Sequence, residues 1–443
     1  MSRSGSLGRE ARAGRGDSTE RTEGRDDEAP SSASLVPLLR SEVGDGVFDL
    51  HLPPLDLEAG GRIAPHVVRG WSSGPAEAPV ILIVHALTGD ARVDRWWGPV
   101  VGPGRALDPT RFRLLCFNLL GSCYGSAGPG SRGFPVGDVQ LTTWDQARSI
   151  LLALDALRIE RVHLVVGGSL GGMVSLCLAA LEPTRFERVA PIAAAAAASA
   201  WVVGFNHVAR QVIRLDPGFP ARADRGLSLA RQLAMLTYRA EPGLEQRQPR
   251  PVEPPWTLHP AYPIRGYLEH QGTRLVQRFD PRSYLSLLDA MDHHDLARRP
   301  PGVEEGEPQE ARRLRGGGGG QGRSRRLAER GSEAERGREG DPWRQAKHGL
   351  EEASRRREAE AEDLSLAWGV RRITASLLAV SIDSDRLFCP EQIHRLVRAL
   401  QDRGAVAEEA MLTSAHGHDA FLVEWNQVAA VLERALDLPA GHR

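Results

Sequence analysis

Cysteine and long apolar runs are both scarce in this chain of 443 residues. The four cysteines are Cys116, Cys123, Cys177 and Cys389, and no two have the C-x-x-C spacing of a zinc or redox site. Three of them lie in or beside apolar runs, where a buried, reduced thiol is the usual state. No stretch of about 18 apolar residues occurs, so the sequence predicts no transmembrane helix.

An excess of charge of either sign is also missing. Lysine and arginine total 56 against 57 for aspartate and glutamate, which gives a net charge of −1. A protein that binds nucleic acid or an anionic membrane needs an ordered basic surface, and this balance gives no case for one. The N-terminal residues lack the apolar core of a secretory signal. We therefore expect a cytoplasmic protein with no nucleic-acid or membrane partner.

Two segments have little to bury. Residues 1–34 are mostly glycine, serine, arginine and acidic residues, which predicts a disordered N-terminal tail. Residues 300–362 contain a run of glycines and then alternating arginine and glutamate. Since the glutamates offset the arginines, this pattern favours a solvated, disordered insertion over a nucleic-acid-binding segment.

The rest of the chain alternates apolar runs with helical patterns. Near-continuous apolar runs are typical of parallel strands that are covered on both faces. They occur at 79–87, 112–120, 161–167, 188–196 and 375–383, with helical patterns such as 142–157 and 171–183 between them. This alternation predicts an α/β fold with a mostly parallel sheet and helices on both faces.

Residues 203–299 interrupt the alternation. Four stretches there, 205–215, 226–240, 262–279 and 281–297, have apolar spacing near 3.6 residues and read as helices. We expect them to form a helical cap inserted into one catalytic domain. The core would then comprise residues 35–202 and 363–443.

Gly167-x-Ser169-x-Gly171 is the only G-x-S-x-G pattern in the chain. An apolar strand precedes it and a helical run follows, which is the context of a nucleophile held on a tight strand-to-helix turn. A phosphate-binding loop would need lysine where Met173 stands. A glycine-rich turn with an idle serine is the remaining alternative. We interpret Ser169 as a nucleophile.

A serine nucleophile needs a base and a carboxylate, which follow it in the order Ser, Asp, His in α/β-hydrolase folds. Asp385 lies just past the strand at 375–383, with Asp383 as a rival. His416 and His418 follow, and spacing alone does not choose between them.

The same chemistry needs two backbone N–H groups that stabilise an oxyanion. We assign one to Leu170, which follows the nucleophile in the chain, and the other to Leu87, at the end of the apolar run at 79–87.

Several stretches resemble the homoserine O-acetyltransferase family of the α/β-hydrolase superfamily. They include HALTGDA, NLLGSCYGS, GGSLGGM, GLSLARQLAMLTYR, IDSDRLF and GHDAFL. The resemblance implies Ser169 as nucleophile, Asp385 as orienting acid and His418 as base. It further implies that Arg231, with Tyr238 on the same helix face, binds the acceptor's carboxylate and that Asp419 binds its ammonium.

The resemblance also implies a reaction. Acetyl-CoA would serve as a co-substrate, no cofactor would be bound, and acetyl would pass through Ser169 to the hydroxyl of L-homoserine, a step in methionine biosynthesis. A homodimer through the cap helices is expected. A serine acceptor, a succinyl donor or a plain esterase remain alternatives. Adjacent His293 and His294 would point about 100° apart on a helix, so we read them as packing residues and expect no metal site.

Overall fold

The structure is a computed structural model that describes residues 45–135, 140–250, 262–303 and 364–441. The predicted tail at 1–34 and nearly all of the predicted insertion at 300–362 lie outside these ranges. None of the helices within them combines the length and hydropathy that a membrane span requires.

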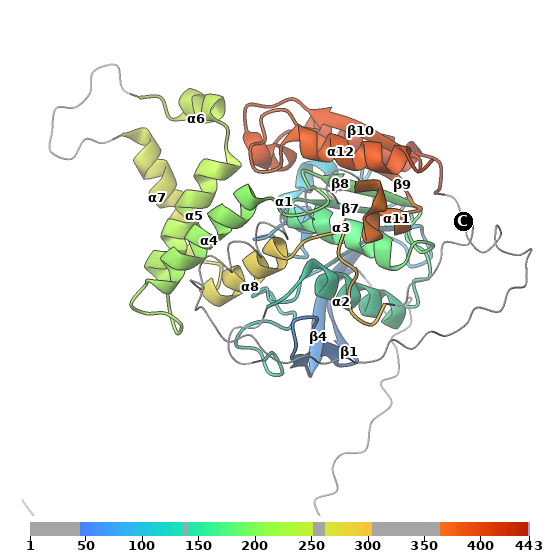
Figure 1. Cartoon of the computed structure of the whole chain (residues 1–443), viewed down its shortest axis with the longest axis horizontal. Helices are drawn as coiled ribbons and strands as arrows, with labels where there is room; N and C mark the ends of the chain where they lie inside the picture. The colour runs from blue at the N-terminus through green and yellow to red at the C-terminus, as the bar shows by residue number, and fades with distance from the viewer. Residues whose placement is uncertain (1–44, 136–139, 251–261, 304–363, 442–443) are drawn as a thin grey trace, which may run out of the picture. The chain divides into compact units, whose positions relative to one another are not determined.

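The described residues form an eight-stranded, mostly parallel sheet (Figure 1). Strand β4 pairs antiparallel with both β1 and β6, and the other strand pairs of this sheet are parallel. In spatial order the strands are β1 (Gly46–Leu52), β4 (His66–Ser73), β6 (Arg113–Phe117), β5 (Val80–Val84), β7 (Leu164–Gly168), β8 (Arg188–Ile192), β9 (Ser376–Ile382) and β10 (Ala407–Leu412). A separate two-stranded sheet pairs β2 (Leu55–Asp56) with β3 (Arg62–Ile63).

All five predicted strands are present in the eight-stranded sheet, and its strands β1, β4 and β10 are additional to them. Strands β1 and β10 lie at the two edges of the sheet. Their sequences, GVFDLHL and AEEAML, mix polar with apolar residues because an edge strand is only partly covered. A search for continuous apolar runs therefore misses them.

The two faces of the sheet bury separate apolar clusters, because side chains on a strand alternate between faces. In β5, Leu82 and Val84 belong to one cluster and Ile81 and Ile83 to the other. The first cluster packs against α2 (Thr143–Ala156), α3 (Leu170–Leu181), α11 (Trp368–Arg372) and α12 (Pro390–Gln401). The second packs against α1 (Val93–Trp96), the 3-10 helix η2 (Gly98–Val100) and α13 (Trp425–Asp437). This arrangement confirms the predicted α/β-hydrolase fold class.

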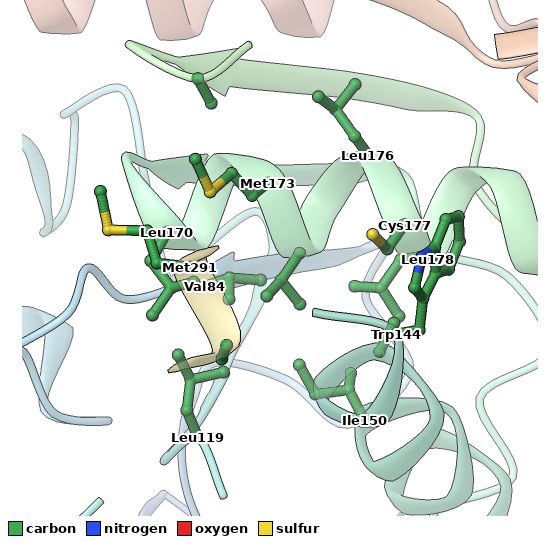
Figure 2. Packing of buried hydrophobic residues seen from close by; sticks show 14 of the residues in the cluster. Val84, Leu119, Trp144, Ile150, Leu170, Met173, Leu176, Cys177, Leu178 and Met291 are labelled. Carbon is green, nitrogen blue, oxygen red and sulfur yellow. The ribbon is translucent and has the colours of Figure 1, made fainter. Parts of the chain in front are cut away.

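Helix α3 is almost entirely buried between the sheet and neighbouring helices. Figure 2 shows Trp144 and Ile150 of α2 beside Cys177 and Leu178 of α3. Fully burying a side chain of this size contributes about 1.5–3 kcal/mol. The first turn of α3, which follows Ser169 directly, is thereby held in a fixed position.

Between β8 and residue 303, the described part of the chain forms five α-helices. They are α4 (Ala200–Arg214), α5 (Asp224–Tyr238), α6 (Glu241–Arg247), α7 (Pro263–Val276) and α8 (Pro281–Asp292). Four of them match the helical stretches expected for the cap, and the short α6 is additional. Its first turn carries proline and glycine, which weaken the apolar spacing used to recognise helices.

The prediction that His293 and His294 are both packing residues is correct for His294 only. Helix α8 ends at Asp292, so neither histidine lies within it. His294 is buried, and its ring contacts Oγ1 of Thr143 and the carbonyl oxygen of Ala195, both at 3.0 Å. His293 is exposed, and the hydrogen bond of its ring among the described residues is to the carbonyl of Asp289 in α8. Packing of the cap against the core is therefore the role of His294 alone.

Candidate active site

Ser169 stands on a strained turn between β7 and α3. Its φ is 56° and its ψ is −125°, a conformation that non-glycine residues rarely adopt. The backbone N–H donates to the carbonyl of Ile192 at 2.8 Å, which ties the turn to β8. Within the described ranges, Oγ makes no hydrogen bond. The Ser169 hydroxyl therefore stands at the turn without a hydrogen bond to another described residue.

Glycines make room for this turn. A Cβ on Gly171 would stand 2.1 Å from the carbonyl oxygen of Val84, and one on Gly167 would stand 2.4 Å from the backbone of Gly171. Both contacts are far below van der Waals distance and involve backbone, which cannot swing aside. Only glycine therefore allows β5, β7 and α3 to meet this closely.

His418 and Asp385 form a buried pair. Asp385 follows β9, His418 lies in the 3-10 helix η4 (Gly417–Leu422) after β10, and Nδ1 of the ring is 2.7 Å from Oδ2 of the carboxylate. The other oxygen of Asp385 accepts from the backbone N–H groups of Leu387 and Phe388 at 2.8 and 3.0 Å. Burial lowers the pKa of His418, but the charge and hydrogen bond of Asp385 outweigh it, so the net pKa is raised.

The second ring nitrogen of His418, Nε2, has no partner among the described residues. Because Nδ1 donates to Asp385, the neutral ring carries its lone pair on Nε2. Nε2 is buried and has no hydrogen-bond partner in the described ranges. The ring lies among Tyr238, Phe388 and Phe421, with ring centroids 5.6, 5.3 and 5.8 Å away. An unpartnered buried nitrogen of this kind costs stability and is typical of a group kept ready for proton transfer.

The turn that carries Ser169 reaches the histidine through Phe421. A Cβ on Gly168, the residue before Ser169, would stand 2.4 Å from the ring of Phe421. That ring in turn packs against His418. The fold thus brings the turn of Ser169 close to the Asp385–His418 pair, although these residues are far apart in the sequence.

The rival residues have other partners. Asp383 is exposed and accepts from the backbone N–H of Ser414 at 3.0 Å. His416 lies 3.1 Å from a guanidinium nitrogen of Arg247, and burial together with this charge lowers its pKa. Neither contacts the Asp385–His418 pair in the described ranges. The geometry therefore favours the pair that the family resemblance also selects.

Backbone donors lie at the ends of β5 and β7. Leu170 is the first residue of α3, and Leu87 follows β5 in a loop where its N–H has no acceptor within the described ranges. His85 shapes that loop. Its Nδ1 donates to the carbonyl of Ala86 at 2.8 Å, and its Nε2 accepts from the N–H of Leu119 at 3.0 Å. His85 was not predicted as a site residue, because it lies inside the apolar run at 79–87, whereas β5 ends at Val84.

Two of the expected substrate-binding residues lie on α5 and the third, Asp419, lies in η4. The guanidinium carbon of Arg231 is 5.8 Å from the centre of the Tyr238 ring, so the two share a helix face as predicted. Asp419 is largely buried, and its Oδ2 lies 3.2 Å from Nε of Arg239. Arg239 was not predicted, since nothing in the sequence pairs it with a residue 180 positions away.

Among the described residues, no group of three or more His, Cys, Asp or Glu side chains is placed to hold a metal ion. The site combines a serine on a strained turn, a histidine with an unpartnered nitrogen, and a carboxylate hydrogen-bonded to that histidine. A mostly parallel sheet with this constellation defines an α/β hydrolase-fold protein. A family model described as alpha/beta hydrolase fold matches residues 79–287.

Relatives of similar sequence identify the family within the α/β hydrolase-fold class. The homoserine O-acetyltransferase of Moorella thermoacetica is 32% identical over 408 residues, covering 86% of this chain and 92% of the relative. That of Symbiobacterium thermophilum is 33% identical over 439 residues, covering 91% and 97%. The chain belongs to the homoserine O-acetyltransferase family.

Solved structures share the fold. A homoserine O-acetyltransferase from Bacillus anthracis superposes with a TM-score of 0.68 at 20% identity, over 90% of this chain and 99% of that one. The esterase E22 superposes with a TM-score of 0.66 at 18% identity, over 88% and 99%. Because transferases and esterases share this architecture, the fold alone does not separate the two reactions.

Proposed function

We propose that this protein transfers an acetyl group from acetyl-CoA to the hydroxyl of L-homoserine through an acyl-enzyme on Ser169. The observation that carries the proposal is the Asp385–His418 pair, with Nε2 of His418 buried and unpartnered beside the turn of Ser169. The chain's membership of a family of homoserine O-acetyltransferases supports the choice of substrates.

In the first half-reaction Ser169 is acetylated. Nε2 of His418 takes the hydroxyl proton as Oγ attacks the thioester carbonyl, and the imidazolium is stabilised by Asp385. The N–H groups of Leu87 and Leu170 stabilise the tetrahedral oxyanion. The intermediate collapses by breaking the carbon–sulfur bond, and His418 returns its proton to the departing CoA thiolate.

In the second half-reaction the acceptor replaces CoA. His418 removes the proton of the homoserine hydroxyl, whose oxygen attacks the acetyl carbonyl. The bond to Oγ of Ser169 then breaks, and the serine recovers its proton from His418. The product is O-acetyl-L-homoserine. A ping-pong sequence of this kind splits one difficult transfer into two steps that use the same groups.

The acceptor must be held better than water. We assign its carboxylate to Arg231, whose planar guanidinium suits a two-pronged contact with carboxylate. Tyr238 lies between Arg231 and His418. Burial raises the pKa of its hydroxyl well above the ordinary value, so it stays a hydrogen-bond donor. We assign the ammonium to Asp419. An esterase has no need of this pair of opposite charges.

We further propose that the enzyme is a cytoplasmic homodimer joined through the cap. Large apolar side chains stand exposed on α4, just past its end and on α5, among them Trp201 (56%), Leu215 (79%), Leu229 (53%) and Leu236 (49%). Leu229 and Leu236 are seven residues apart and Trp201 and Leu215 are fourteen apart, which places each pair near one face of its helix. Exposed apolar faces of this kind mark contact surfaces. The four free cysteines suit a reducing compartment.

The experiment that tests the function measures CoA release from acetyl-CoA and from succinyl-CoA, each with water, L-homoserine or L-serine. We expect steady-state release of CoA that requires both acetyl-CoA and homoserine, and none with Ser169→Ala. One methylene separates serine from homoserine, and a binding pocket distinguishes such a difference by about 1–3 kcal/mol. The ratio of the rates with homoserine and with serine therefore measures the specificity for the acceptor. Equal release without any acceptor would make the protein a hydrolase and contradict the proposal.

A further inference from the structure

The end of α5 lies directly against the loop that carries His418. Gly417 shows how closely the two approach. Its φ is 62°, and a Cβ there would stand 2.7 Å from the backbone N of Ala240 and 2.8 Å from the carbonyl oxygen of Tyr238. The residue before the histidine can therefore only be glycine. The histidine loop rests on the backbone of the cap, so the cap helps to fix the catalytic side chain.

Consecutive residues on the two segments form matching pairs. Tyr238 packs against His418, and the next residue, Arg239, contacts Asp419. The side chains of Arg239 and Asp419 are only 17% and 11% exposed, so solvent screens their attraction weakly. Nε of Arg239 is 3.2 Å from Oδ2 but is not aligned to donate a hydrogen bond to it. The contact is therefore an electrostatic one.

This contact occupies one carboxylate oxygen and leaves the other available. Within the described ranges, no hydrogen bond or ion pair engages Oδ1 of Asp419. A carboxylate that is held by one oxygen keeps a fixed orientation, because rotation about its last bond would break the ion pair. The second oxygen then points in one direction and can accept a cation at little cost in ordering.

We propose that Arg239 is a positioning residue for the acceptor: it holds Oδ2 of Asp419 so that Oδ1 can bind the acceptor's ammonium, and it offsets the charge of Asp419 at His418. This inference rests on the proposed function, which assigns the ammonium to Asp419. Arg239 itself touches neither reacting atom and acts through its neighbour.

Because Arg239 offsets the charge of Asp419, it should affect the pKa of His418. The charge of Asp419 stabilises the protonated form of His418 and so raises its pKa. Loss of the arginine would leave that charge unopposed and raise the pKa further. The charged and titratable groups around the ring come from each element packed on it: Asp385 after β9, Asp419 in η4, Tyr238 at the end of α5, and Arg231 and Arg239 behind that tyrosine.

The test compares Arg239→Met with the wild-type enzyme in both half-reactions. We expect the KM for homoserine to rise about tenfold or more, while acetylation of Ser169 by acetyl-CoA stays within about threefold. The acidic limb of kcat/KM for acetyl-CoA should move to higher pH by about half a unit. Arg239→Lys, which keeps the charge, should restore most of both effects.

Arg247→Met is the matched control. Arg247 also contacts the histidine loop, at His416, but it is exposed and does not contact Asp419. We expect its homoserine KM and pH profile to match wild type. An unchanged homoserine KM in Arg239→Met, or equal losses in the two half-reactions with no shift of the acidic limb, would overturn the proposal. Wild-type enzyme without acceptor-dependent turnover would instead overturn the proposed function.

Asp419→Asn keeps the proposal testable if Arg239→Met does not fold. Removing the carboxylate should also raise the KM for homoserine, but it should move the acidic limb to lower pH, opposite to the arginine variant. In the Asp419→Asn background, Arg239→Lys should then change neither quantity further, because there is no carboxylate left to hold. A further change of KM in that background would show that Arg239 acts independently of Asp419.

Discussion

Nδ1 of His418 lies 2.7 Å from Oδ2 of Asp385, and the opposite ring nitrogen is buried without a partner. One hydrogen bond thus fixes both the tautomer and the orientation of the ring. The carboxylate is itself held by two backbone N–H groups, so the whole pair is rigid.

Replacing Asp385 by asparagine should cut turnover about a hundredfold or more, because an amide can stabilise the wrong tautomer of His418. It should also change the pH profile. His418 must be neutral to act as base, so activity rises with pH through its pKa, which Asp385 raises. In Asp385→Asn the acidic limb should therefore move to lower pH. Steady-state rates from pH 5 to 8 measure both effects.

Asp383→Asn is the control for that variant. Asp383 stands two residues away, is exposed, and contacts only backbone of the neighbouring loop. We expect its rate and pH profile to match wild type. A loss like that of Asp385→Asn would mean that the wrong carboxylate has been assigned.

Arg231→Ala should raise the KM for homoserine about tenfold or more while acetylation of Ser169 stays near the wild-type rate. The guanidinium is assigned only to the acceptor's carboxylate, which is absent in the first half-reaction. Single-turnover release of CoA separates the two steps. Arg225→Ala, an exposed position on the same helix, provides the comparison. If both half-reactions slowed equally in Arg231→Ala, its assignment would be wrong.

Gly171→Ala should destabilise the protein by about 2 kcal/mol or more. The added Cβ would stand 2.1 Å from a backbone oxygen of β5, so strand and helix would have to move apart. Gly204→Ala is the opposite case, since this glycine lies in α4 with nothing within 4 Å of its Cβ position. It should stabilise the protein by about 0.5–1 kcal/mol. Urea unfolding of both variants checks the contrast.

His294→Gln should make the free energy of unfolding less sensitive to acid. Burial lowers the pKa of His294 to about 4, below the ordinary value of 6.5. Between those values the unfolded chain binds one more proton there than the folded chain. Stability is therefore present above about pH 6.5 and falls by up to about 1.4 kcal/mol per unit as the pH drops toward 4.

Unfolding midpoints in urea between pH 4.5 and 7 measure that slope. The pH slope of the free energy of unfolding should be smaller in the variant than in wild type, by the contribution of about one proton. His293→Gln alters the exposed neighbour and should leave the slope unchanged. An unaltered slope in His294→Gln would show that His294 does not remain neutral in the folded protein.

Replacing Leu215 and Leu236 together by glutamate should convert a dimer into a monomer. The charges would have to be buried in the proposed contact between cap helices, where no partner has been identified for them. Sedimentation velocity measures the change. Met411→Glu, which alters a similarly exposed apolar side chain on β10 (52% exposed), should leave the assembly intact. A wild-type monomer at micromolar concentration would contradict the dimer.

The sequence by itself determined the order of the elements and the residues at their ends. Apolar runs located five strands, and the pattern around Ser169 placed a serine on a strand-to-helix turn. These features are local, since periodicity and turn chemistry depend on neighbouring residues. Edge strands were missed because their pattern is weaker when only part of the strand is covered.

The tertiary structure decided which side chains meet. Spacing left His416 and His418 open, and only the fold shows the ring of His418 against Asp385. The pairing of Arg239 with Asp419 and the burial of His294 likewise depend on segments far apart in the chain. Such contacts follow from how helices and strands pack in three dimensions, and no short stretch of sequence contains that information.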